Sequence, residues 1–112
     1  MKKIFLLLLI FFNFRVILYA EEYNAKEICN IIWIIEGDNK AKQYYGINPK
    51  YIKCNTKKEC KQICINTVEN NKIRFKNQKE EKDFLKFLAK RYCPFNWEVW
   101  LKNLKYYLKK GK

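Results

Sequence analysis

One acidic residue, Glu36, stands at the end of an apolar run and has the setting that most favours chemistry in this chain. The run I-C-N-I-I-W-I-I occupies residues 28–35, and Gly37 follows Glu36 directly. Four isoleucines recur in it at helical spacing: Ile28, Ile31, Ile32 and Ile35. This spacing predicts a helix over residues 25–36, with Gly37 as its stop and Glu36 in its last turn.

Two effects disfavour a charged carboxylate at Glu36 in this predicted position. Its neighbours are apolar, and the C-terminal end of a helix dipole is negative. A carboxyl group that stays protonated near neutral pH is what a general acid needs, so we expect Glu36 to be catalytic. The alternative is an ordinary solvated acid at a helix end.

Composition excludes several other kinds of site. The chain has no histidine, so a Ser-His-Asp or Cys-His arrangement is absent. Its three glycines are not spaced as in a phosphate-binding loop. The spacing C-x5-C-x3-C from Cys54 to Cys64 lacks a paired zinc knuckle. We therefore expect no metal and no cofactor.

The first 20 residues have the pattern of a secretory signal peptide. A basic start precedes an unbroken apolar run over residues 4–12, and Ala20 is a suitable last residue before cleavage. The stretch carries Arg15 and falls short of the roughly 20 residues of a permanent membrane span. We expect an exported protein, in the periplasm or cell envelope or secreted, that meets the membrane only through residues 1–20, with one domain over residues 21–112.

The five cysteines and the basic charge both fit export. An exported chain forms disulfides, but the sequence leaves the pairing open; Cys60 and Cys64, four apart on a predicted helix, are expected to bond elsewhere than to each other.

Without residues 1–20 the net charge is +10, from 21 basic and 11 acidic residues. This charge suits an anionic partner, although the lysines alternatively reflect composition alone. Because they are scattered, no nucleic acid is expected as partner; we expect a monomer.

The remaining pattern predicts a mainly α (α+β) domain of about four helices. A small β-hairpin, with strands over residues 43–47 and 50–54, follows the first helix and forms a wall beside Glu36. Later helices are predicted over residues 57–75, 80–92 and 97–109. Thr56 with Glu59 forms the capping box of the second, and Asn96 can cap the last.

The order of these elements resembles the lysozyme-like superfamily, in particular small exported bacterial or phage lytic transglycosylase-type domains. The matching pieces are Ile34-Ile35-Glu36-Gly37, Tyr45-Gly46-Ile47, residues 63–71, and Arg91-Tyr92-Cys93-Pro94 with residues 96–108. The longer transglycosylases have Ser where Gly37 stands and Leu-Met in place of Ile47-Asn48.

This resemblance implies a peptidoglycan-cleaving enzyme that acts on β-1,4 glycosidic bonds, with peptidoglycan strands as its partner. Glu36 matches the catalytic acid, and a single acid favours a lytic transglycosylase over a two-carboxylate hydrolase. Implied substrate-binding residues are Tyr45, Gly46, Ile47, Asn66 and Tyr92. For the two tyrosines the alternative is a role as packed aromatics, and for Asn66 a place on the solvated surface.

Two other functions compete with this enzyme. The first is a non-catalytic exported cationic protein that binds cell-wall glycan or a partner protein. The second is a cationic protein that binds membranes or nucleic acid, with affinity that falls steeply with salt. A groove with Glu36 at its base favours the enzyme or the glycan- or partner-binding protein. A flat lysine face favours the protein that binds membranes or nucleic acid.

Overall fold

Four α-helices carry the core in the part of the chain that the computed structural model describes, residues 23–48 and 50–111. They are α2 (Ala25–Ile35), α3 (Lys57–Lys76), α4 (Phe84–Tyr92) and α5 (Trp97–Lys110). Two 3-10 turns, η1 (Asp38–Lys40) and η2 (Tyr44–Gly46), lie between α2 and α3. The prediction of a mainly α domain is confirmed, whereas the predicted signal peptide, residues 1–20, lies outside the described residues. None of the described helices has the length and apolarity to cross a membrane.

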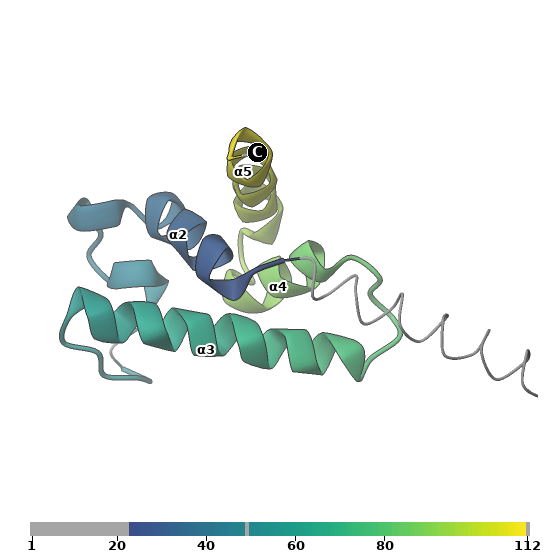
Figure 1. Cartoon of the computed structure of the whole chain (residues 1–112), viewed down its shortest axis with the longest axis horizontal. Helices are drawn as coiled ribbons and strands as arrows, with labels where there is room; N and C mark the ends of the chain where they lie inside the picture. Colours follow the sequence, from purple (N-terminus) through teal and green to yellow (C-terminus); the bar gives the residue numbers. More distant parts are fainter. Residues whose placement is uncertain (1–22, 49, 112) are drawn as a thin grey trace, which may run out of the picture.

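Helix α2 lies between the other elements and joins them into one core. It packs on α3 and on α5, while α4 packs on α5 and α3. In Figure 1, α3 extends along the lower side of the molecule and the other three helices lie above it. Side chains from four helices meet with no exposed surface: Ile28, Ile32, Val68, Phe84, Leu88 and Leu104. Two of the isoleucines predicted from helical spacing, Ile28 and Ile32, therefore face apolar side chains of the other three helices.

Helix α2 begins and ends where local chemistry dictates. The Asn24 side chain accepts hydrogen bonds from the backbone N–H groups of Lys26 (2.8 Å) and Glu27 (3.2 Å). Gly37 has φ +105°, in the left-handed region where glycine is unstrained, and ends the helix as predicted. Glu36 thus becomes the last residue before a sharp change in chain direction.

The third predicted helix starts later than expected. The sequence predicted residues 80–92, but α4 begins at Phe84. Asp83 is its N-cap, and one carboxylate oxygen accepts from the backbone of Leu85 (3.1 Å) and Lys86 (3.4 Å). The Gln78 side chain bonds both backbone groups of Glu81, at 2.8 and 2.9 Å, which holds the preceding residues in a turn. Side-chain bonds to the backbone here outcompete helix formation.

The predicted β-hairpin is not formed, because the described residues contain no strand. Tyr45 and Gly46 have φ values of +60° and +69°, in the left-handed region. Strands need φ near −120° to −140°, so these two residues interrupt any extended segment. The chain makes the compact turn η2 instead.

Candidate functional site

Glu36 is the C-cap residue of α2, and its carboxyl group is held from the side by α5. The indole N–H of Trp100 donates a hydrogen bond to Glu36 Oε1 at 3.1 Å. An indole can only donate, so Oε1 accepts in either protonation state of the acid. The second oxygen, Oε2, has no hydrogen-bond partner among the described residues. Trp100 therefore fixes one of the two carboxyl oxygens.

Gly46 covers one face of this carboxyl group. A Cβ atom built on Gly46 would lie 2.8 Å from Glu36 Cδ and 2.9 Å from Oε2, closer than real Cβ atoms approach. The residue also has φ +69°, which side chains disfavour. Both observations require glycine here, and the backbone of η2 can touch the acid only because of it.

Tyr45 and Tyr92 hold the turn in place. The Tyr45 ring is only 2% exposed and packs on Trp33, with ring centroids 5.1 Å apart. The Tyr92 hydroxyl donates a hydrogen bond to the backbone carbonyl of Tyr45. Burial raises the pKa of the Tyr92 phenol, so the group stays protonated and keeps its proton for this bond.

These contacts close into a ring of five residues, here named the Glu36 network: Glu36, Tyr45, Gly46, Tyr92 and Trp100. The ring of Tyr92 stacks on Trp100 at a centroid distance of 5.1 Å and an interplanar angle of 20°. Trp100 bonds Glu36, Glu36 touches Gly46, and Gly46 follows Tyr45. Four elements, α2, η2, α4 and α5, thus fix a single carboxyl group.

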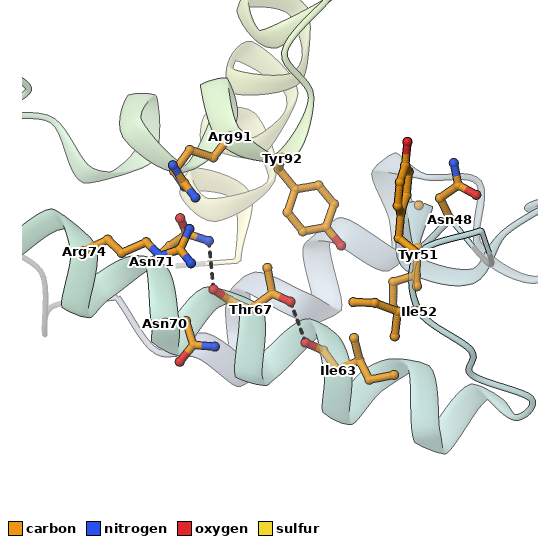
Figure 2. A pocket seen from close by; sticks show the side chains of 12 residues that line it. Asn48, Tyr51, Ile52, Ile63, Thr67, Asn70, Asn71, Arg74, Arg91 and Tyr92 are labelled. Atoms are coloured by element: carbon orange, nitrogen blue, oxygen red, sulfur yellow. Dashed lines mark hydrogen bonds between the residues drawn. The ribbon is translucent and has the colours of Figure 1, made fainter.

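A pocket of about 380 Å³ adjoins the Glu36 network. It lies between the segment after η2, α3 and the end of α4 (Figure 2). Its lining comprises Gly46, Ile47, Asn48, Tyr51, Ile52, Ile63, Thr67, Asn70, Asn71, Arg74, Arg91 and Tyr92. Glu36 does not line this pocket, so the pocket is not the predicted groove with Glu36 at its base. The two sites share Gly46 and Tyr92.

Asn71 is the buried polar group of the pocket. Its side-chain N–H donates to the Thr67 carbonyl at 2.8 Å, but its Oδ1 has no hydrogen-bond partner among the described residues (Figure 2). The residue is 6% exposed. A buried acceptor without a donor costs about 1–3 kcal/mol of stability. A group that carries such a cost in a pocket wall is a candidate ligand contact.

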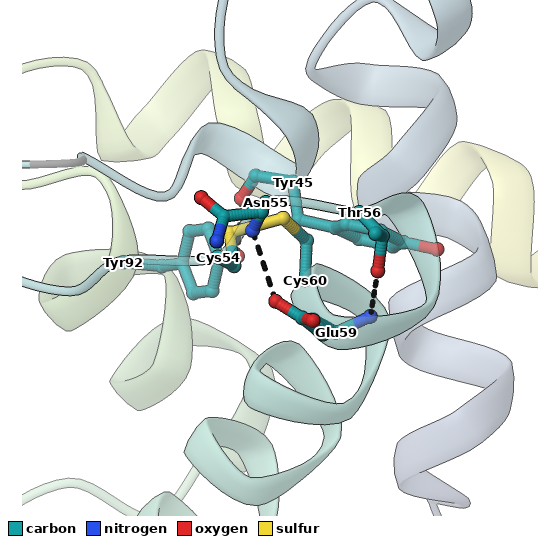
Figure 3. The surroundings of a disulfide bond; sticks show 7 residues. All are labelled: Tyr45, Cys54, Asn55, Thr56, Glu59, Cys60 and Tyr92. Carbon is teal, nitrogen blue, oxygen red and sulfur yellow. Dashed lines mark hydrogen bonds between the residues drawn. A yellow bond between two sulfur atoms is a disulfide. The ribbon is translucent and has the colours of Figure 1, made fainter.

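A disulfide between Cys54 and Cys60 ties the pocket's loop wall to the start of its helical wall (Figure 3). Thr56 caps α3 by accepting from Glu59 N at 3.1 Å. The other half of the predicted capping box is shifted, since Glu59 Oε2 accepts from Asn55 N at 3.0 Å and not from Thr56. Cap and disulfide together fix where the loop enters the helix.

The three other cysteines are free thiols, two of them buried. Cys29 on α2 and Cys64 on α3, here named the α2–α3 thiol pair, share a side-chain hydrogen bond. This bond, followed by burial, raises the pKa of the Cys29 thiol. No three histidine, cysteine or acidic side chains gather to hold a metal ion within residues 23–48 and 50–111.

The predicted site residues are brought together in part. Glu36, Tyr45, Gly46 and Tyr92 meet in one network, and Ile47 lines the adjoining pocket. Tyr45 lies with its ring in the core, so it supports the turn and offers no face for a sugar.

Asn66 lies away from the pocket. Its side chain is exposed and accepts from Gln62 at 2.9 Å on α3 itself, so the surface alternative describes it better. The amides of α3 that line the pocket are Asn70 and Asn71, which lie about one helical turn further along the helix.

Sequence reasoning missed three residues. Trp100 lies in the helix predicted over residues 97–109, but the sequence does not indicate that it donates to Glu36. Arg74 and Arg91, the other two, both line the pocket. The rarity of arginine could have drawn attention to Arg74 and Arg91. Only three of the 24 basic residues are arginines, and the remaining one, Arg15, lies in the apolar N-terminal stretch.

Comparison with protein-family models, with curated proteins and with solved structures finds no match.

Proposed function

We propose that this protein is a lytic transglycosylase that cleaves β-1,4 glycosidic bonds of peptidoglycan, with Glu36 as its single catalytic acid. The observation that carries the proposal is the setting of the Glu36 carboxyl group. Trp100 fixes Oε1, Gly46 covers one face, and Oε2 has no partner within the described residues. A pocket lined by amide, aromatic and cationic side chains begins at Gly46.

The proposed chemistry needs one carboxyl group that gives and takes a proton. Glu36 Oε2 protonates the bridging oxygen, and the bond from that oxygen to the sugar carbon breaks. The resulting carboxylate then takes a proton from the substrate's own hydroxyl, whose oxygen bonds to the same carbon and forms an anhydro ring. Glu36 ends protonated, as it began, and no water is consumed.

The absence of a second carboxylate favours this reaction over hydrolysis by an acid pair. Neither the pocket lining nor the Glu36 network contains another acid within the described part of the chain. Asp38, the nearest acid in sequence, accepts from the backbone N–H of Asn39 in its own turn. Glycosidases that use two carboxylates need both beside the scissile bond.

The proposal includes the fold, a reduced member of the lysozyme-like superfamily. A helix that ends in Glu36-Gly37, a Tyr45-Gly46-Ile47 turn folded back on the acid, and three further helices support it. In this proposal the turn η2, which follows Glu36 along the chain, stands in for the family's hairpin.

The test compares the purified protein with Glu36→Gln on cell-wall suspensions. We expect the wild type to clear them and the variant to clear at least about a hundredfold more slowly, since general acid catalysis contributes about 10²–10⁴-fold. Glu27→Gln is the matched control, because Glu27 is an exposed acid on the same helix. Mass spectra of the released fragments should show anhydro ends. Equal clearing by wild type and Glu36→Gln would exclude Glu36 as the catalyst.

One observation favours a second function, the binding of glycan without cleavage. Glu36 lies outside the pocket lining, so a glycan can occupy the pocket without contact to the acid. This function predicts retention on insoluble peptidoglycan with no released fragments, for both wild type and Glu36→Gln.

A further inference from the structure

The pocket has two chemically different ends. Arg74, Asn71 and Arg91 gather at one end, and Tyr51 and Ile52 stand at the other (Figure 2). The cationic end is drawn from two helices, since Arg74 belongs to α3 and Arg91 to α4. A ligand that fills the pocket therefore meets positive charge on one side and apolar surface on the other.

The positive charge at this end of the pocket comes from arginine and not from lysine. Lysine supplies nearly all positive charge in this chain, yet both arginines of the described residues line this one pocket. Guanidinium groups bind carboxylates through two parallel hydrogen bonds, which a lysine ammonium cannot do. Composition alone would have placed lysine here, so the pattern points to recognition of a carboxylate.

No acid within the described residues neutralises the two guanidinium groups. Neither arginine forms an ion pair there, and Glu69, the nearest acid along α3, lies 3.8 Å from Lys72. Arg91 rests over the Phe87 ring at 5.8 Å, which restricts its position. The positive charge is thus available to a ligand.

Asn71 adds a hydrogen-bond acceptor at the same end of the pocket as the two arginines. Its buried Oδ1 lacks a donor within the described residues, and Asn71 lines the pocket at the end where the two arginines lie (Figure 2). The matching ligand group is an N–H. A ligand that offers both a carboxylate and a nearby N–H has the chemistry of a peptide's C-terminal residue, with its free carboxylate and its own amide.

We propose that this pocket binds the carboxyl-terminal residue of a short peptide, with Arg74 and Arg91 on the carboxylate and Asn71 Oδ1 on the amide N–H. That the peptide is the stem attached to peptidoglycan rests on the proposed function. The enzyme then selects glycan strands that carry peptides over bare strands. A bound peptide would touch Gly46 and Tyr92, the two residues that the pocket shares with the Glu36 network.

The test measures binding by calorimetry on the Glu36→Gln variant, so that cleavage cannot interfere. The probes are N-acetyl-alanyl-alanine, N-acetylmuramyl-alanine, and analogues of each with an amidated carboxyl group or an N-methylated last amide. We expect both carboxylate forms to bind and each analogue to bind at least about tenfold more weakly, because it lacks one charged or polar contact. Equal binding of free and amidated probes, or no binding of either free probe at millimolar concentration, overturns the proposal.

Variants of the protein provide the second arm. Arg74→Gln and Arg91→Gln should each weaken binding of the carboxylate probes by about tenfold or more. Lys102→Gln, an exposed lysine on α5, makes the same charge change away from the pocket and should leave binding within about twofold. If the arginine variants lose no more than Lys102→Gln, the carboxylate does not bind there.

The outcomes separate this inference from the proposed function. Tighter binding of the muramyl probe than of the free dipeptide identifies the peptidoglycan stem as the source. Equal binding of the two supports a general peptide-terminus site and leaves the stem unsupported. If wild type releases no fragments while the carboxylate dependence holds, the enzyme proposal fails and the binding site stands.

Discussion

Gly46→Ala tests whether the position of the Glu36 carboxyl group matters for activity. The new Cβ would lie 2.8 Å from Glu36 Cδ, whereas carbon atoms pack at about 3.5–4.0 Å. The carboxyl group or the turn must therefore move by roughly 1 Å. A misplacement of about 1 Å at a catalytic group costs about a hundredfold in rate. We expect clearing of cell-wall suspensions by Gly46→Ala to fall by about that factor.

The same substitution also strains the backbone, and this effect needs its own control. An alanine at φ +69° costs about 1–2 kcal/mol, which lowers the Tm of a domain of this size by about 5–15 °C. Gly37→Ala is the matched variant, because Gly37 has φ +105° and its added Cβ would meet only Ala41, at 3.5–3.6 Å. Gly37→Ala strains the backbone at least as much, because φ +105° lies beyond the left-handed region of L-residues, and the three atoms nearest its Cβ all belong to Ala41.

The two variants are compared at a temperature where circular dichroism shows both folded. Gly46→Ala should have lost most activity there, and Gly37→Ala should retain it to within a few-fold. If both lose activity equally, backbone strain is the cause and the contact with Glu36 is irrelevant. If Gly46→Ala clears suspensions at the wild-type rate, a precisely held Glu36 carboxyl group does not carry the reaction.

Three further predictions concern the surroundings of the site. Trp100→Phe keeps an aromatic ring but removes the indole N–H from the acid, and we expect clearing to fall about tenfold with an unchanged far-ultraviolet circular dichroism spectrum. Reduction of the Cys54–Cys60 disulfide, which closes a sequence separation of 6, should lower the free energy of unfolding by roughly 2 kcal/mol in urea titrations, and an unchanged midpoint would contradict this. In the native protein, iodoacetamide should modify Cys93, which is partly exposed. The α2–α3 thiol pair is buried, and the pKa of Cys29 is raised, so we expect the pair to react only after unfolding. Labelling of the pair at the rate of Cys93 would contradict its burial.

The helices were largely predictable because their signals are local. Helix α2 ends at a glycine, and Thr56 and Asp83 cap the helices that follow them. The start of α4 was missed because Asp83 resembles any other charged residue within a helical pattern, and only its bonds to the backbone make it a cap. The hairpin was missed for a different reason: Tyr45 at φ +60° is strained, and no local rule predicts strain that tertiary contacts impose.

Four members of the Glu36 network were predicted as site residues, but its contacts were not, because they join residues far apart in sequence. The bond from Trp100 to Glu36 spans 64 positions, and that from Tyr92 to Tyr45 spans 47. A tryptophan at helical spacing gives the same signal whether its N–H meets a carboxylate or not. Trp100 meets Glu36 only because of how α5 lies against α2.

Gly46 and Tyr92 connect the two halves of the site. Each lines the pocket, and each also helps to hold the Glu36 carboxyl group, one by contact and the other through Tyr45 and Trp100. Because the contacts of the Glu36 network form a closed ring, a ligand that shifts Gly46 or Tyr92 should also shift the Glu36 carboxyl group. Binding of a peptide and the position of the Glu36 carboxyl group are therefore expected to be coupled. Occupancy of the pocket by N-acetyl-alanyl-alanine should then alter the rate of the proposed cleavage of bare glycan strands. An unchanged rate at saturating dipeptide would mean that the pocket and the acid act independently.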